Sequence, residues 1–323
     1  MSYLVSLIIP VYKAENFIKK TMISICEQTL KNFEIILIDD CSPDASMDIA
    51  ISVLKKYPTR FKASKIVRFE KNVGIANVRK YAINLATGKY IASIDSDDYF
   101  ELYALEKMLE SIENSQSDIA FFDYYNTYSG KNDYIIQKIG VDKEETIRYL
   151  LMNKLHGSLC NKLYKKDILD NIVILDDINM SEDLLITIQA VFISKKISYH
   201  SEAFLYYVQH NSHSLTKKYN NKKIKDMIVG IQFIENFFVE RNVYISYKPA
   251  LDYRKQIIKA ESITHADSSQ RKMYYNLFPN LKLNYNDLGW YKSIILFLAE
   301  KKIFLLINIF IHLRQIIKLS VGR

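Results

Sequence analysis

The sequence predicts an α/β fold in which a mostly parallel sheet is flanked by helices. Short runs rich in Ile and Val alternate with segments of helical spacing through the first hundred residues, and this order of strand and helix requires parallel neighbours. Carboxylates gather where several of these runs end, which is where parallel sheets bind their ligands. The chain has 323 residues, 49% of them hydrophobic, which suffices for one large or two ordinary domains.

Short apolar runs are predicted as the strands of this sheet. They are LVSLIIPVY (4–12), FEIILIDD (33–40), SKIVRFE (64–70) and KYIASIDSD (89–97). A further run, SDIAFFDYY (117–125), is predicted to continue the sheet.

Three segments between these runs repeat apolar residues at intervals of three and four and are predicted as helices. They are residues 15–30, 43–57 and 73–88. Ser42 and Asp44 are expected N-caps of the second helix, and Gly88 is the expected left-handed cap of the third.

The rest of the chain is less regular. Up to about residue 215 we expect short helices and loops, and beyond it a lysine-rich helical region. The tail, residues 290–319, is the most apolar segment, but its longest uncharged run, Ile303 to Ile311, is far shorter than the roughly 20 residues of a spanning helix. The tail therefore predicts a helix or helical hairpin that either lies in the membrane interface or packs on the protein.

Charge and cysteine content narrow the function classes. The formal net charge of +8 permits nucleic acid, anionic lipid or a phosphorylated small molecule as a partner, but the lysines form no stripe on a recognition element, so nucleic-acid binding is disfavoured. Three scattered cysteines, Cys26, Cys41 and Cys160, argue against a disulfide framework and a zinc site and favour a reducing cytoplasm. The apolar N-terminus is predicted to be the first strand and not a signal peptide.

The stretch KYIASIDSDDYF (89–100) places Asp95, Asp97 and Asp98 directly after a predicted strand. Carboxylates in D-x-D spacing on a tight loop suit a divalent cation that bridges to phosphate oxygens. The alternative is that Asp97 or Asp98 caps a following helix, DYFELYALEKML. A second acidic pair ends the run 33–40, and Arg79 suits a phosphate, so together they favour a nucleotide-diphosphate site.

An ordered series of motifs resembles the family 2 glycosyltransferases of GT-A fold, the bacterial type that builds capsules and lipopolysaccharide. They are SLIIPVYKAENFI, SICEQTLKNFEIILIDDCSPD, NVGIANVRKYAINLATGKYIASIDSDD, NKLYKKDIL, SEDLLIT and YYVQHNSHSLT. The resemblance covers roughly residues 4 to 216.

The resemblance implies a uridine donor. Pro10, Val11 and Tyr12 fall where the family packs the nucleobase, and Asp40 falls where a carboxylate accepts from the uracil N3–H. The chain departs from the family pattern nearby, with Lys13 in place of a common Asn and Cys41 in place of a common Gly.

The same resemblance implies roles for the acids. Asp95 matches the acid that faces the ribose, Asp97 matches the acid that reaches an Mn²⁺ or Mg²⁺ ion on the diphosphate, and Asp98 is a supporting acid. Arg79 matches an arginine near the diphosphate; Lys80, after it, replaces a common Asn, and Ala82 a common Gly.

Asp183 in SEDL matches the general base of the inverting members, and its alternative role is to cap the helix that follows, in competition with Ser181 and Glu182. The family's metal- or phosphate-contacting position falls on His210 or His213, and we favour His210.

These matches predict a metal-dependent, inverting hexosyl- or N-acetylhexosaminyltransferase. It would move a sugar from a UDP-sugar to a hydroxyl of a growing surface glycan, with an acceptor linked to lipid and a location in the cytoplasm at the inner face of the membrane. The predicted domains are 1–216, with a nucleotide-sugar part (1–115) and an acceptor part (116–216), and a helical region, 217–323, with possible membrane contact. The alternative is a non-catalytic assembly partner that keeps a degenerate sugar-nucleotide fold.

Overall fold

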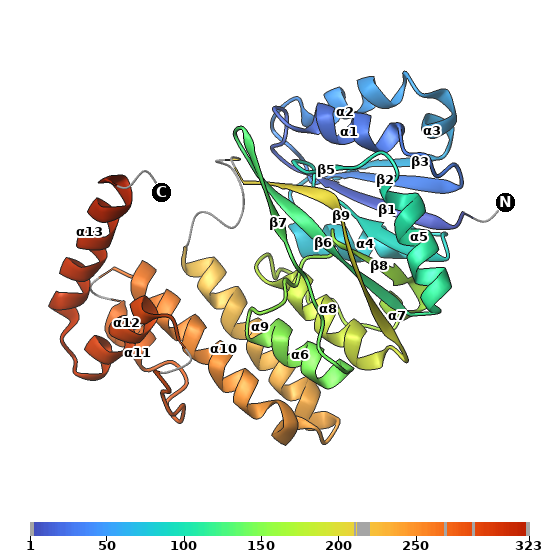
Figure 1. Ribbon diagram of the computed structural model, residues 1–323. Helices are drawn as coiled ribbons and strands as arrows, with labels where there is room; N and C mark the ends of the chain where they lie inside the picture. Colours follow the sequence, from blue (N-terminus) through green and yellow to red (C-terminus); the bar gives the residue numbers. More distant parts are fainter. Residues whose placement is uncertain (1–2, 210, 212–219, 268–269, 286–287, 321–323) are drawn as a thin grey trace. The chain divides into compact units, whose positions relative to one another are not determined.

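The computed structural model describes residues 3–209, 211, 220–267, 270–285 and 288–320. The chain divides into two compact units, residues 1–217 and 218–323, whose elements are labelled in Figure 1. This division falls one residue from the predicted boundary after residue 216.

A curled nine-stranded sheet forms the centre of the first unit. Its strands are β1 (Val5–Val11), β2 (Phe33–Asp39), β3 (Ser64–Arg68), β4 (Tyr90–Ser93), β5 (Tyr99–Phe100), β6 (Ile119–Tyr128), β7 (Lys131–Ile135), β8 (Lys162–Lys165) and β9 (Ile197–Val208). Their order is β3-β2-β1-β4-β8-β6-β9-β5, with β7 paired to β6. Strands β1 to β4 pair in parallel, which confirms the predicted mostly parallel sheet. Strand β8 runs antiparallel to both β4 and β6, so the second half of the sheet is mixed.

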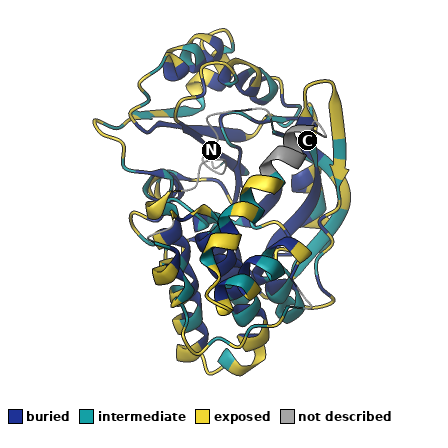
Figure 2. Ribbon diagram, turned by 90° about the vertical axis from the view of Figure 1, so that its left-hand side faces the viewer, coloured by how far each residue is buried: buried dark blue, intermediate teal, exposed yellow. Residues whose placement is uncertain are grey.

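Helices cover both faces of this sheet (Figure 1). They are α1 (Ile18–Cys26), α2 (Ser46–Leu54), α3 (Pro58–Lys62), α4 (Ile75–Leu85), α5 (Ala104–Ser115), α6 (Lys143–Leu151), α7 (Lys166–Leu169) and α8 (Glu182–Ile193). Apolar residues of α1, α2 and α5 pack on one face, and α4 and α7 pack on the other. Every residue of β1, β2 and β4 is buried, as expected for strands covered on both sides (Figure 2).

The prediction that Gly88 ends the third helix was wrong. Helix α4 ends at Leu85, and Ala86 after it is already extended. Gly88 serves a different purpose, because a Cβ there would lie 2.6 Å from the backbone nitrogen of Ser6. The glycine lets the chain that enters β4 pass close to β1.

The expected N-caps of the second helix are also displaced. Helix α2 begins at Ser46, so neither Ser42 nor Asp44 occupies the N-cap position. The carboxylate of Asp44 still accepts a hydrogen bond from the Ser46 backbone nitrogen at 3.1 Å and another from the Ser42 hydroxyl at 2.6 Å. Asp44 therefore orders the entry to the helix from one residue further away.

Strands β7, β8 and β9 fall in the region where only short helices and loops were expected. Strand β8 is four residues long with lysine at both ends, and β9 interrupts its apolar residues with Ser, His and Glu. Neither shows the clean alternation from which strands are predicted. Strand β9 nevertheless lies between β6 and β5, inside the sheet.

The second unit is helical, as predicted. Its described helices are α9 (Asn221–Glu240), α10 (Tyr244–His265), α11 (Arg271–Tyr275), α12 (Trp290–Glu300) and α13 (Phe304–Ser320). The apolar tail forms α12 and α13, which contact each other. Within the described ranges, no helix has both the length and the hydropathy needed to cross a membrane.

A buried carboxylate, Glu34 on β2, joins three strands beside the entry to β4. It accepts from the Ser6 hydroxyl at 2.6 Å and from the Thr87 backbone nitrogen at 2.6 Å, and it pairs with Lys65 of β3 at 2.8 Å. Burial alone would raise the pKa of Glu34, but these hydrogen bonds together lower it below the ordinary 4.5.

We expect Glu34→Gln to destabilise the protein by about 2 kcal/mol at pH 7, because hydrogen bonds to a charged group are lost. Since the pKa of Glu34 is lowered on folding, its contribution is present above pH 4.5 and is lost as the pH falls through the folded value. Urea unfolding of both proteins at pH 7 and at pH 4 should therefore show a difference that shrinks with acid. Asp48→Asn, which breaks an exposed pair with Arg68, is the control and should change little at either pH.

Candidate active site

An acidic turn follows β4 and is fixed to the end of β9. The Asp98 backbone nitrogen donates to the Asp95 carbonyl at 3.1 Å, and its buried carboxylate accepts from the Val208 backbone nitrogen at 2.8 Å. Asp97 is partly exposed and accepts from the Asn211 side chain at 2.7 Å. Helix α5 begins only at Ala104, so neither Asp97 nor Asp98 caps a helix, and that alternative is wrong.

The carboxylate of Asp98 is suited to a cation. Its second oxygen, Oδ2, is buried without a hydrogen-bond partner among the described residues. Burial, and then the charges of Asp97 and Asp95, raise the pKa of Asp98 well above its ordinary value. An acid in this state is stable when it is protonated or when a positive charge faces it.

The side chains around Asp98 that could act as metal ligands show whether the predicted divalent cation fits here. Ligand atoms of Asp95, Asp98 and Cys160 lie within 4.8 Å of one another. Burial raises the pKa of the Cys160 thiol well above its ordinary value, and a protonated thiol is a poor ligand for Mg²⁺ or Mn²⁺. The carboxylates of the turn, however, supply the oxygen atoms that these ions prefer, so the acidic turn fits a divalent cation.

Arg79, on α4, is buried between two carboxylates. Its terminal nitrogens pair with Glu182 and, at 3.1 Å, with Asp95. Burial disfavours the charged guanidinium, but Glu182 and Asp95 outweigh this cost and raise the pKa of Arg79. Arg79 thus connects the acidic turn to the start of α8, and its role towards a diphosphate stays a prediction.

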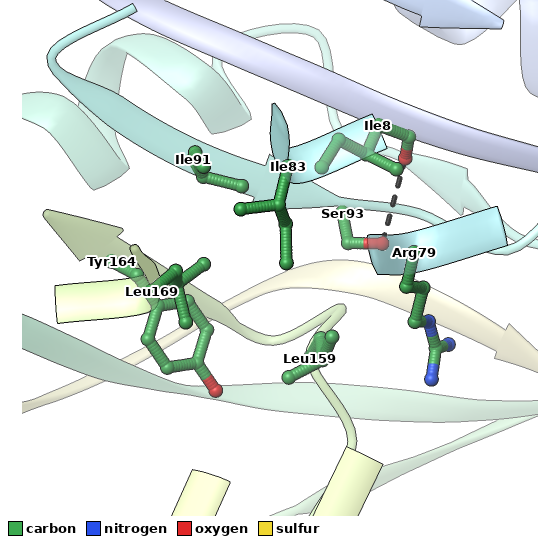
Figure 3. A pocket seen from close by; sticks show the side chains of 8 residues that line it. All are labelled: Ile8, Arg79, Ile83, Ile91, Ser93, Leu159, Tyr164 and Leu169. Carbon is green, nitrogen blue, oxygen red and sulfur yellow. Dashed lines mark hydrogen bonds between the residues drawn. The ribbon is translucent and has the colours of Figure 1, made fainter. Parts of the chain in front are cut away.

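An apolar pocket lies beside Arg79, between the sheet and helices α4 and α7 (Figure 3). Figure 3 shows Arg79 at its edge and Ile83, Ile91 and Leu169 on its other side. The Ser93 hydroxyl within it already donates to the Ile8 carbonyl at 3.5 Å. The pocket therefore offers few polar groups to a ligand, and it belongs to the packing that holds Arg79 in place.

The N-terminus of α8 presents two acids in different states. Glu182 is buried, which raises its pKa to about 7 against the opposing charge of Arg79. Asp183 is partly exposed, and its carboxylate accepts from the Leu184 backbone nitrogen at 2.7 Å. Ser181 occupies the N-cap position, so the capping role considered for Asp183 is wrong. Asp183 therefore lies in the first turn of α8, with its carboxylate partly open to solvent.

The predicted nucleobase residues lie at the carboxyl ends of β1 and β2. Pro10 and Val11 are buried, whereas Tyr12 is 37% exposed. The Asp40 carboxylate accepts from the backbone nitrogens of Val73 at 2.6 Å and Gly74 at 3.0 Å, and burial raises its pKa. Each oxygen keeps a second lone pair for a further donor.

The predicted histidines cannot be placed. His210 and His213 both lie outside the described residues.

A family model described as "Glycosyl transferase family 2" matches residues 6–173, which is more than half of the chain. EpsH of Bacillus subtilis (strain 168) is 31% identical over 257 residues, which cover 77% of this chain and 73% of EpsH. The chain is a family 2 glycosyltransferase. This confirms the resemblance inferred from the ordered motifs.

A second relative and two solved structures add detail. The Escherichia coli UDP-Glc:alpha-D-GlcNAc-diphosphoundecaprenol beta-1,3-glucosyltransferase WfaP is 35% identical over 49% of this chain, and the match spans 59% of WfaP. The S. aureus TarS 1–349 structure with UDP-GlcNAc covers 93% of this chain and 92% of its own at a TM-score of 0.63 and 19% identity. The Pyrobaculum calidifontis mannosyltransferase PcManGT, solved with GDP-Man and Mn²⁺, covers 94% of this chain and 87% of its own at a TM-score of 0.51 and 13% identity. These structural likenesses confirm the predicted GT-A fold.

A loop between α6 and β8 of this glycosyltransferase adds residues that sequence reasoning did not single out. The ring of His156 lies 5.8 Å from that of Tyr124 and 6.0 Å from that of Tyr207. Burial, and then the charges of Asp95 and Asp98, raise the pKa of Tyr207, so this aromatic group lies near the acidic turn. The only sequence signal was the position of His156 just ahead of the NKLY block.

Lys162 holds this loop in place from below. Its fully buried ammonium donates to the carbonyls of His156 at 2.9 Å and Ser158 and to the Asn161 side chain at 2.9 Å. Burial lowers the pKa of Lys162 to about 7, but three acceptors require three N–H bonds, which only the protonated form has. The adjacent Gly157 lies so close to α8 that a Cβ there would be 3.0 Å from the Cα of Leu184.

We expect Lys162→Met to lower the rate constant of glycosyl transfer at least about tenfold, because the buried carbonyls of His156 and Ser158 lose their donor and the loop shifts. Steady-state kinetics should show the loss in kcat, with little change in the KM of the donor. Lys166→Met, which removes a partly exposed lysine paired with Asp170, is the matched control. A parallel loss in both variants would contradict a positioning role for Lys162.

The two positions beside the predicted nucleobase residues at which the chain departs from the family pattern share a backbone conformation. Lys13 and Cys41 have φ angles of 51° and 55°, in the left-handed region. Asn and Gly, the residues common at these positions in the family, adopt this region more readily than Lys and Cys.

We expect Cys41→Gly to stabilise the protein by about 0.5–1 kcal/mol, because glycine relieves the left-handed strain but costs entropy on folding. Cys41→Ala is the control, since it also removes the thiol but keeps the Cβ. In thermal unfolding, the midpoint should be higher than that of the wild type for Cys41→Gly but not for Cys41→Ala. An equal rise for alanine would mean that the thiol, and not the backbone, carries the effect.

Proposed function

We propose that the protein transfers a sugar from a UDP-sugar to a hydroxyl of a growing surface glycan with inversion at the anomeric carbon. The arrangement around Arg79 carries this proposal. An acidic turn suited to a cation and a partly exposed carboxylate, Asp183, are joined through one buried guanidinium and its pair with Glu182. This pairing would hold the proposed donor site and the proposed proton acceptor in a fixed relation to each other.

The donor is proposed to be a uridine diphosphate sugar. Tyr12 would stack on the base above Pro10 and Val11, and Asp40 would accept from the uracil N3–H. The UDP-GlcNAc bound to TarS supports this choice, whereas PcManGT was solved with a guanosine donor. The test below therefore includes other nucleotides.

The acidic turn is proposed to hold Mn²⁺ or Mg²⁺. Asp97 would contribute oxygen atoms with support from Asp98, His210 is the expected additional ligand, and Asp95 would face the ribose of the donor. When bound, the ion would neutralise negative charge on the diphosphate as it leaves. The unpaired Oδ2 atom of Asp98 supports this assignment, and so does the Mn²⁺ in the PcManGT structure.

Asp183 is proposed as the general base. Its carboxylate would take the proton of the acceptor hydroxyl as that oxygen forms a bond to C1 of the sugar. The bond from C1 to the phosphate oxygen breaks on the opposite face, and its electron pair leaves with UDP. Attack opposite the leaving group inverts the configuration at C1.

The acceptor is proposed to be a lipid-linked glycan at the inner face of the membrane. The name of WfaP, which includes a diphosphoundecaprenol acceptor, supports this proposal. The acceptor would then bind on the side of His156, and the donor would bind on the side of the acidic turn.

We expect Asp97→Asn and Asp183→Asn each to reduce transfer at least about a hundredfold, but to differ in donor binding. Thermal-shift panels with UDP, GDP, CMP and dTDP, with and without Mn²⁺, provide the measurement. UDP with Mn²⁺ should shift the midpoint of the wild type and of Asp183→Asn, and the shift should be lost in Asp97→Asn.

Asp167→Asn, on the exposed surface of α7, is the control and should keep both activity and the shift. A larger shift with another nucleotide would exclude a uridine donor. Absence of any shift and of any UDP-sugar hydrolysis in folded wild type would favour the non-catalytic assembly partner.

A further inference from the structure

One face of helix α13 packs against the other helices of the second unit. Ile307 is fully buried, and Phe310 stacks on Tyr291 with ring centres 5.4 Å apart. Asn308 accepts a hydrogen bond from Arg271, and the guanidinium of Arg314 lies 3.6 Å from the Tyr291 ring centre. The helix is therefore packed in place and is not a loose tail.

The outward face of α13 is apolar as well. Leu305, Ile309 and Leu313 recur every four residues and are 72%, 49% and 52% exposed, and Leu306 beside them is 44% exposed. Figure 2 shows the yellow, exposed positions along this helix near the C-terminal label. A helix packed on a protein normally turns polar residues towards the solvent. Leu305, Leu306, Ile309 and Leu313 instead form an exposed apolar stripe, which we call the apolar stripe of α13.

The charge of the chain is concentrated in the same unit. Residues 218–323 contain 18 Lys and Arg and 8 Asp and Glu, a formal charge of +10, whereas residues 1–217 contain 26 and 28, a formal charge of −2. Two of these cations, Lys301 and Lys302, are exposed in the turn that leads into α13. The apolar stripe is thus preceded by positive charge in a strongly basic unit.

This combination decides between two occupants of the stripe. A second copy of the chain would bring two units of charge +10 together, and their repulsion would oppose the contact. An anionic lipid surface offers both an apolar layer for the stripe and negative headgroups for the lysines.

We propose that α13 lies on the surface of an anionic bilayer, with the apolar stripe in the interface and Lys301 and Lys302 beside the headgroups. The inference that α13 contacts lipid does not depend on the proposed function. Its consequence, that the enzyme meets a lipid-linked acceptor at the membrane, rests on that function.

The test is co-sedimentation of the full chain with vesicles, without nucleotide. Vesicles of phosphatidylcholine and phosphatidylglycerol at a 7:3 ratio should bind the protein, and pure phosphatidylcholine vesicles should bind it at least tenfold more weakly. Leu305→Gln/Ile309→Gln/Leu313→Gln should lower the partition coefficient at least tenfold. Val239→Gln/Ile245→Gln is the matched control, because these two residues are 51% and 78% exposed on other helices of the same unit.

A second variant keeps the proposal testable if the triple variant folds poorly. Lys301→Gln/Lys302→Gln leaves the packed face intact and should weaken binding at least threefold at low salt, with a smaller difference at 500 mM NaCl. Failure of the wild type to bind the mixed vesicles, or equal binding by the folded triple variant, would overturn the proposal. A concentration-dependent dimer in sedimentation velocity that only the triple variant loses would assign the stripe to a second copy instead. Since no nucleotide is present, none of these results depends on the transferase reaction.

Discussion

A buried guanidinium, that of Arg79, is the interaction on which the site depends. Carboxylates from the turn after β4 and from the start of α8 meet around this buried guanidinium, where like charges would otherwise repel one another. Arg79 pairs with one acid from each group, across 16 and 103 residues of sequence. Without it Glu182 would be a buried charge without compensation, and the start of α8 would have no electrostatic reason to stay beside the turn.

The same pairing separates the roles of neighbouring acids. Glu182 and Asp183 are adjacent in sequence, but one faces Arg79 in the interior and the other remains partly exposed. The helix start fixes this difference, since successive helical residues point about 100° apart. One residue can therefore stabilise the cation while the next remains available for chemistry.

The sequence was most informative where local pattern and packing agree. The runs that became β1, β2 and β4 are fully buried, so they are mostly apolar, and the acids that follow β2 and β4 lie at the edge of the sheet where the site is proposed. Prediction failed where a residue's purpose is set by one specific partner and not by a repeating pattern. Gly88 is required by the backbone of Ser6, Glu182 by Arg79, and Lys162 by carbonyls of its own loop, and none of these needs leaves a periodic signal.

The position of β9 in the sheet has a consequence for biosynthesis. The Asp98 carboxylate accepts from Val208, and the Glu101 backbone nitrogen donates to the Phe204 carbonyl, so the acidic turn takes its shape from a strand made some hundred residues later. Strands β1 to β4 can pair as they leave the ribosome, but the turn stays unsupported until β9 inserts between β6 and β5. A nascent chain that stops short of β9 would hold most of the sheet and expose the edge of β6, which makes it a substrate for chaperones and not a partial enzyme.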